Sequence, residues 1–258
     1  MYLDTMFPDE LDRYIEENEN RTAVIPIGSV EQHGVHLLLG TDGFTAYAMA
    51  AKAAEILGGV LLPMVPYSWI GGLRPFAGTF DMRPFITAEY MEQIGLNVFN
   101  LGFDKLVFVN THGGGREMVY SVARRIFKKV GKPVVTMYPS NFHFAWPEHG
   151  EIWAEHGVEH NWTVYEASKL VGALQRLGEH AIAEKVLTNL KNALEEFSGG
   201  VTIPEQPGLR SAFTLGEIGH DYNHECQHAP PQPVLCPEAG SKATDFMAAK
   251  LAWVAQNA

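Results

Sequence analysis

The stretch TAVIPIGSVEQHGVHLLLGTD, residues 22–42, decides both the fold and the site that we expect this chain to form. Its first six residues, 22–27, are apolar except for the initial threonine and lead into a Gly-Ser pair, as expected for a buried strand that ends in a loop. The following segment, 42–57, is rich in alanine and is typical of a helix with Thr41 or Asp42 as its N-cap. The stretch therefore predicts a strand, a polar loop and a helix in succession.

The same alternation of strands and helices continues along the chain. Further strands are predicted over residues 59–65, 105–110 and 133–138. Further helices are predicted over residues 8–18, 87–101 (with Thr87 as cap), 117–130, 162–177, 179–197 and 238–256. Short apolar strands that alternate with helices favour parallel pairing, with helices on both faces of the sheet. We therefore expect an α/β fold, a three-layer α/β/α sandwich with a mostly parallel central sheet, formed as one domain over residues 1–258.

The composition excludes several classes of partner. The chain has 258 residues, of which 46% are hydrophobic and 19% are charged, as in an ordinary soluble globular protein. Its formal net charge of −11 argues against nucleic acid and against a membrane surface as partners. No run of about 18 apolar residues is present, and the N-terminus does not resemble a secretory signal. We expect a cytoplasmic protein in which Cys226 and Cys236 are free thiols.

The loop after the first predicted strand contains residue types that bind divalent cations. Glu31 and His33 are two residues apart, so in an extended segment their side chains point the same way and both can reach one cation. Asp42 follows at the predicted helix start, where a carboxylate is favoured by the helix dipole but can also be only a cap. Carboxylates and imidazoles this close together favour a metal site. The alternative is a hydrogen-bonded polar loop with His36 as a packing residue.

A second polar motif follows the predicted strand over residues 105–110. His112 leaves this strand directly before three glycines, 113–115, which let the backbone approach a ligand closely. Reactive groups gather at the carboxyl ends of parallel strands, so this motif and the first are candidates for one site. A tight strand-to-helix turn without a ligand is the alternative. Glu117 is nearby, but it is more simply a residue of the first helical turn.

The two motifs resemble those of the creatininase (creatinine amidohydrolase) family. Residues 28–42 match the family's Gly-Ser-x-Glu-Gln-His-Gly-Pro-His-Leu-Pro-Leu-Gly-Thr-Asp, with Val35 and Leu38 in place of its prolines. The resemblance implies a creatininase-like fold and two divalent metal ions per subunit, zinc or manganese, with iron(II) as an alternative. The metal ligands that it implies are Glu31, His33, Asp42 as the bridging residue, and His112.

A third family segment, commonly His-Ala-Gly-x-x-Glu-Thr-Ser, is matched less regularly. Glu166, followed by Ala-Ser, fits its second half, and His160 fits its histidine if one residue is inserted. The resemblance then implies that Glu166 is the last metal ligand and that His160 transfers a proton to the leaving nitrogen, with His156 as the alternative. An exposed helix charge and a surface histidine are the structural alternatives.

The chain departs from the family in segments that we assign to substrate binding. Creatininase has a metal-binding Glu at the position of Gly114, and its absence argues against creatininase activity itself. Arg74 is suited to bind a substrate carboxylate or phosphate, or else forms a surface salt bridge. Trp162 borders segment 141–161, which we interpret as an aromatic-rich loop that is either a lid or a subunit interface. The histidine-rich run 220–228 is either a structural zinc site or, more simply, a loop near a neighbouring subunit's active site.

The resemblance implies a metal-dependent hydrolase that cleaves a C–N bond of a cyclic amide or a formamide in a small molecule. Two divalent ions can hold a bridging hydroxide at neutral pH, which suits attack on an amide-type carbon. The alternatives are a two-metal hydrolase that opens a C–C or lactone ring of a sugar-derived metabolite, and a non-catalytic metal-binding relative. The family also implies a homo-oligomer, often a hexamer, which aromatic-rich loops permit.

Overall fold

The computed structural model describes residues 1–33, 37–71, 76–138, 146–156, 162–197 and 236–258. Its centre is a sheet in the order β2-β1-β3-β4 in which every pairing is parallel. The strands are β1 (Thr22–Ile27), β2 (Val60–Leu61), β3 (Lys105–Asn110) and β4 (Val134–Met137). Each crossover between neighbouring parallel strands contains a helix, as the alternation in the sequence predicts.

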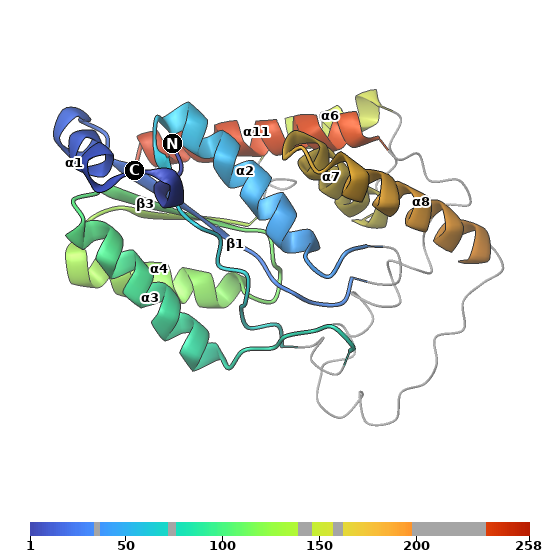
Figure 1. The fold of residues 1–258 in the computed structure, drawn as a ribbon, viewed down its shortest axis with the longest axis horizontal. Helices are drawn as coiled ribbons and strands as arrows, with labels where there is room; N and C mark the ends of the chain where they lie inside the picture. Colours follow the sequence, from blue (N-terminus) through green and yellow to red (C-terminus); the bar gives the residue numbers. More distant parts are fainter. Residues whose placement is uncertain (34–36, 72–75, 139–145, 157–161, 198–235) are drawn as a thin grey trace.

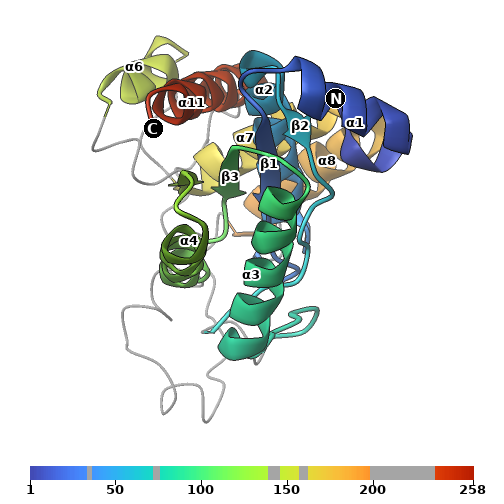
Figure 2. The same ribbon diagram turned by 90° about the vertical axis from the view of Figure 1, so that its left-hand side faces the viewer.

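Helices cover both faces of this sheet. They are α1 (Pro8–Glu17), α2 (Thr41–Leu57), α3 (Pro84–Asn100), α4 (Arg116–Val130), α6 (Glu148–Glu155), α7 (Trp162–Arg176), α8 (His180–Phe197) and α11 (Pro237–Gln256), with a short 3-10 helix over Leu3–Thr5. Helices α3 and α4 lie below the sheet in Figure 1, and α2, α7 and α11 lie above it. The view in Figure 2 shows the strands between these two layers. The expected three-layer sandwich is confirmed, whereas the single domain over residues 1–258 stays a prediction.

Alternating side chains of the strands form two separate cores. Ala23, Ile25 and Ile27 of β1 are fully buried against α3 and α4. Val24 points to the opposite face, where it joins residues of α2 and α11. Because both faces of β1 are buried, every one of its residues is inaccessible to solvent, as parallel sheets require. This burial fixes the end of β1, from which the polar loop starts.

Four details of the predicted elements are wrong. Strand β2 is shorter than residues 59–65 because Pro63 has no amide hydrogen to continue the ladder. Helix α3 begins at Pro84 rather than at a Thr87 cap, since proline is favoured in the first helical turn. Gly40 is the N-cap of α2, so Thr41 and Asp42 lie inside its first turn.

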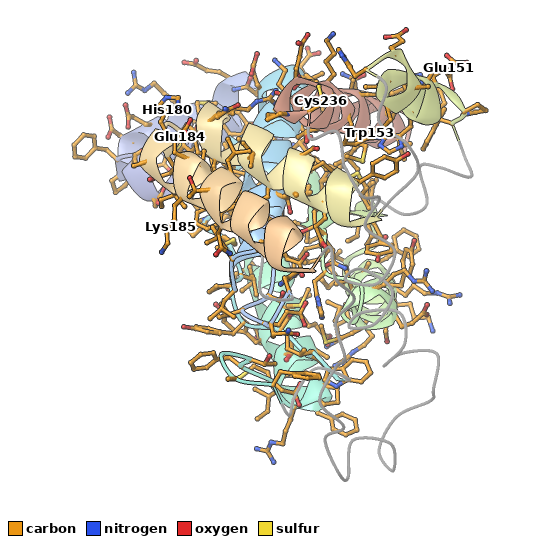
Figure 3. The ribbon with its side chains drawn as sticks, turned by 90° about the vertical axis from the view of Figure 1, so that its right-hand side faces the viewer. Glu151, Trp153, His180, Glu184, Lys185 and Cys236 are labelled. Carbon is orange, nitrogen blue, oxygen red and sulfur yellow. The ribbon has the colours of Figure 1, made fainter. Side chains whose placement is uncertain are left out.

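The fourth is helix α6, which lies inside the segment 141–161 that we interpreted as a loop. Its residue Trp153 is fully buried and stacks on Tyr165 of α7, with ring centroids 4.3 Å apart. Figure 3 shows Glu151 of the same helix pointing away from the body of the protein. The helix therefore has one packed face and one exposed face. We did not predict it because eight residues are too few to show this periodicity clearly in a segment rich in histidine and tryptophan. No described helix is long and apolar enough to cross a membrane.

Helices α7 and α11 approach each other more closely than side chains would allow. A Cβ atom added at Gly240 of α11 would lie 2.2 Å from the carbonyl oxygen of Ser168 in α7. Gly172 of α7 is similarly tight, since its Cβ would lie 2.9 Å from the oxygen of Pro237. These contacts involve backbone atoms, which cannot swing aside as a side chain can. The contact at Ser168 holds α7 in place two residues after Glu166, so it also helps to position the side chain of Glu166.

The Gly240→Ala substitution is therefore expected to lower the free energy of unfolding by about 1–3 kcal/mol or more, because the added methyl group overpacks the α7–α11 contact. The matched control is Gly150→Ala in α6, where nothing lies within 4 Å of the added atom. That change should raise stability by about 0.5–1 kcal/mol through helix propensity. Urea unfolding of both variants measures the difference, and equal stabilities would contradict the close packing.

Candidate metal centre

Four polar side chains from three segments meet at the C-terminal edge of the sheet. Glu31 and His33 follow β1, Asp42 lies in the first turn of α2, and His112 follows β3. Strands β1 and β3 are neighbours, with Ile27 paired to Asn110 at their last residues, so the two motifs leave the sheet side by side. The four side chains are buried, at 3%, 9%, 5% and 3% exposure respectively. The sequence prediction that both motifs form one site agrees with this geometry.

A close approach of two glycines brings Asp42 to the end of β1. A Cβ atom at Gly28 would lie 2.5 Å from the Cα atom of Gly43, so only glycine fits where the strand meets α2. Ser29 follows directly, and its hydroxyl lies 2.7 Å from Oδ2 of Asp42 and 3.0 Å from Oε1 of Glu31. The carboxylate of Asp42 therefore faces the other acidic residue instead of capping its own helix.

The two imidazoles lie on opposite sides of Asp42. Nδ1 of His112 is 2.7 Å from Oε1 of Glu31 and 3.2 Å from Oδ2 of Asp42. Nε2 of His33 is 3.6 Å from the same Asp42 oxygen and 3.9 Å from Oε1 of Glu166. Glu166 comes from α7, and its side chain is 24% exposed, so it stands at the open side of the cluster.

These five side chains form two overlapping groups suited to cations. One consists of Glu31, Asp42 and His112, and the other of His33, Asp42 and Glu166, with the ligand atoms of each group within 4.8 Å of one another. Asp42 belongs to both groups. Oε2 of Glu31 is buried and has no hydrogen-bond partner among the described residues. An orphaned buried carboxylate oxygen among imidazole nitrogens fits a bound cation, since such oxygens are otherwise paired.

Both histidines are oriented by backbone carbonyls. Nδ1 of His33 is 3.0 Å from the oxygen of Glu31, and Nε2 of His112 is 2.9 Å from the oxygen of Trp69. A carbonyl oxygen only accepts, so in each ring the nitrogen beside it carries the hydrogen. The other nitrogen of each neutral ring then presents its lone pair to the carboxylate cluster. Metal-binding histidines are usually held in this way.

The electrostatics of the cluster show how its negative charge is balanced by protons. Burial alone would lower the pKa of His112, but the carboxylates of Glu31 and Asp42 raise it to about 10. Burial likewise opposes the charge of His33, yet Asp42 raises its pKa well above the usual value. Burial raises the pKa of Glu31, whereas for Asp42 the two imidazoles outweigh burial and hold its pKa well below its ordinary value. Divalent cations can take over the role of these protons.

Neighbouring residues, to which the sequence analysis gave no role, hold the ligands in place. The side chain of Asn110 forms a clip on His112, accepting from its backbone N–H and donating to its carbonyl. The hydroxyl of Thr111 donates to the carbonyl of Asp42 at 2.7 Å. Both residues, like Ser29, stand inside the two motifs. Their position in the sequence, next to the predicted ligands, is the signal by which their role could have been predicted.

Gly114 lies beside the cluster, where it leaves no room for a side chain. A Cβ atom there would be 2.8 Å from Nε2 of His112 and 2.8 Å from the carbonyl oxygen of Ile70. The Glu that creatininase has at this position cannot be accommodated unless these groups move. Glu117 is exposed and pairs with Arg116 at 3.0 Å, so it does not replace that Glu, as expected.

None of the remaining predicted site residues is seen in the cluster among the residues that the structure describes. His160 and Arg74 lie outside the described residues, as do His36 and the run 220–228. Trp162 begins α7, but its side chain is not described. His156 is the C-cap of α6, and its Nε2 lies 3.1 Å from Nζ of Lys242. Cys236 is a free thiol at the N-cap of α11 (Figure 3), and Cys226 lies outside the described residues.

Two residues near the site were missed by the sequence analysis. A Cβ atom at Gly113 would lie 2.8 Å from the hydroxyl of Tyr138, which directly follows β4. The guanidinium group of Arg116, the first residue of α4, lies 5.7 Å from the centre of the Tyr138 ring. Both therefore stand beside the turn that follows His112. The position of Tyr138 at the end of a parallel strand was a signal that the sequence offered.

Comparisons with known proteins agree on one family. The family model Creatininase (creatinine amidohydrolase) matches residues 5–184. A mycofactocin precursor peptide peptidase of Mycobacterium ulcerans is 33% identical in an alignment of 112 residues that covers 40% of this chain and 44% of that protein. A 3-dehydro-scyllo-inosose hydrolase of Thermotoga maritima is 27% identical in an alignment of 135 residues that covers 50% of this chain and 41% of that protein. The chain thus spans less than half the length of these curated relatives.

The fold is also shared with solved structures. The structure named Creatininase Mn has a TM-score of 0.62 and 16% sequence identity, and the match covers 99% of this chain and 96% of that chain. At this level of identity the match establishes the fold alone. Metal use and substrate must be argued from the residues of the site.

The shared position of Asp42 generates a prediction about metal content. We expect two divalent ions per chain in the wild type, one in Glu166→Gln, which keeps the group around His112, and none in Asp42→Ala, which breaks both groups. Elemental analysis after gel filtration measures the ions. The control is Glu117→Gln, an exposed carboxylate that should leave both ions bound. Equal metal content in all four proteins would show that these residues are not the ligands.

Proposed function

The chain belongs to the creatininase family of hydrolases, and we propose that it is a metal-dependent hydrolase that cleaves a C–N bond of a cyclic amide or formamide in a small molecule. The observation that carries the proposal is the pair of largely buried ligand groups that share Asp42. The five residues in them come from four separate segments of the chain. Their convergence on one point has a ready physical reason if they bind cations, and burying so many charged groups is otherwise costly.

Each metal position has its own set of ligands. Glu31, Asp42 and His112 would hold one ion, and His33 and Glu166 would hold the other together with Asp42. Divalent zinc or manganese, with iron(II) as an alternative, supplies Lewis-acid polarisation of a carbonyl and lowers the pKa of water when bound in such a site. The Mn form of a protein with the same fold supports this choice.

The chain's own residues contribute orientation and exclusion of water. The ligands Glu31, Asp42 and His112 are almost inaccessible, so their charges interact strongly in poorly solvated surroundings. Glu166 is the most exposed member, which makes its side the approach for a substrate. We propose that His160, which lies outside the described residues, protonates the leaving nitrogen. Arg74 and Trp162 remain the proposed substrate contacts.

The substrate class is the less constrained part of the proposal. Gly114 has no room for a Glu, which argues against creatinine itself. A second candidate is the opening of a C–C or lactone ring of a sugar-derived metabolite, which the similarity to the inosose hydrolase favours. A non-catalytic metal-binding relative is disfavoured because the family model is that of an amidohydrolase and the named relatives are a peptidase and a hydrolase.

We further propose that the chain is a homo-oligomer, of which a hexamer is the form implied by the family resemblance. The supporting feature is an exposed aromatic surface near the start of α3. Tyr67 and Phe80 are 47% and 56% exposed and lie in ring contact at 5.6 Å. Phe85, in the first turn of α3, is 87% exposed. Exposed aromatic groups of this kind often mark interfaces. A cytoplasmic location stays a prediction.

A substrate screen tests the proposed reaction. We expect the wild-type protein loaded with Mn²⁺ or Zn²⁺ to hydrolyse members of a panel of cyclic amides and formamides. The His33→Ala variant should lose at least about 10³-fold in kcat/KM, because one ligand group is broken. Turnover is measured by chromatography of the products. Lactone turnover alone would favour the second candidate, and equal turnover by both proteins would contradict a metal-dependent reaction.

A further inference from the structure

We propose that Asp81 is a positioning residue of the metal centre, which it holds together through the turn beside His112; this inference rests on the proposed metal-binding function. Asp81 belongs neither to the motifs that carry the family resemblance nor to the ligand groups. Its Oδ1 atom accepts hydrogen bonds from backbone N–H groups. It nevertheless connects the two segments that supply the ligands.

The carboxylate of Asp81 fixes the turn at residues 69–71. Its Oδ1 accepts hydrogen bonds from the backbone N–H groups of Ile70 at 2.9 Å and of Gly71 at 3.2 Å. Gly71 has a φ of +70°, a conformation that suits glycine and lets the turn curl around the carboxylate. Hydrogen bonds to an ionised acceptor are stronger than neutral ones. The two bonds therefore set the direction of the preceding carbonyl group.

That carbonyl group, on Trp69, orients His112. It lies 2.9 Å from Nε2 of the imidazole, whose Nδ1 faces Glu31 and Asp42. Rotation or withdrawal of the Trp69 carbonyl would free Nε2 and allow the ring to turn away from its ligand geometry. Gly114 packs against the same turn, since its Cβ would meet the carbonyl of Ile70.

The other side of Asp81 is attached to the loop that carries Glu31 and His33. The backbone N–H of Phe80 donates to the carbonyl of Val30 at 2.9 Å. The backbone N–H of Gln32, which lies between the two ligands, donates to the hydroxyl of Thr79 at 3.1 Å. Asp81 therefore closes a chain of hydrogen bonds that runs from the first ligand loop to His112. Removal of the Asp81 carboxylate should therefore change the distance between His112 and the loop that carries Glu31 and His33.

Cobalt binding separates positioning from general stabilisation. Metal-free wild type, Asp81→Ala and Asp81→Asn are titrated with Co²⁺, and the visible absorption of the bound ion is recorded. We expect Asp81→Ala to bind at least one Co²⁺ ion about tenfold or more weakly and to show altered visible absorption bands. Loss of a group that orients a metal ligand typically lowers metal affinity by this factor. Asp81→Asn keeps an oxygen acceptor at the same place and should restore the affinity and the spectrum.

The matched control is Asp104→Ala, which removes a carboxylate that binds Arg21 and Lys132 at the opposite end of β3 from His112. It should lower Tm and leave Co²⁺ binding unchanged. If Asp81→Ala does not fold, Asp81→Glu, which moves the acceptor by one methylene, takes its place with the same expected loss. A wild-type Co²⁺ affinity and spectrum in Asp81→Ala, or in Asp81→Glu where it replaces it, would overturn the inference. Wild-type protein that binds no Co²⁺ would instead contradict the proposed function.

Discussion

The burial of three carboxylates at one edge of a parallel sheet is the constraint on which the rest of this structure depends. Glu31 and Asp42 are almost inaccessible, and Glu166 is mostly covered. Like charges in poorly solvated surroundings repel strongly unless positive charge lies between them. In the protein alone, the carboxylates raise the pKa values of His33 and His112 and so favour protonated imidazoles, which supply that charge. Two divalent ions would supply it more fully, and both imidazoles already have one nitrogen aimed at the cluster.

The surrounding structure is arranged to keep these groups together against their repulsion. The contact of Gly28 with Gly43 sets α2 against the end of β1, and the α7–α11 contact at Gly240 holds the helix that carries Glu166. Hydrogen bonds that Ser29 and Asn110 donate, and that Asp81 accepts, then leave each ligand or its loop little freedom. Preorganisation of this kind is what binding and catalysis demand of a site, because orientation achieved during folding need not be achieved again with each substrate.

The sequence was informative where a local rule applies. Two-residue spacing predicted that the side chains of Glu31 and His33 can reach one cation; both lie in the cluster, but they belong to different ligand groups. The alternation of strands and helices predicted the layers. It was less informative where tertiary contacts decide. Asp42 matched a helix cap as well as a ligand until Gly40 was seen to hold the cap position. The Oδ1 atom of Asp81 accepts from backbone N–H groups of a turn, an interaction that no residue pattern predicts. Helix α6 could not be predicted because it is short and because its buried face is defined by packing against α7, which follows later in the chain.

The most direct measurement is anomalous X-ray diffraction from crystals of the protein loaded with Mn²⁺ or Zn²⁺, with data collected on both sides of the metal absorption edge. The account predicts two anomalous peaks flanking the carboxylate of Asp42, one in contact with Glu31 and His112 and the other with His33 and Glu166. The absence of any peak at this carboxylate, or peaks only elsewhere on the protein, would contradict it.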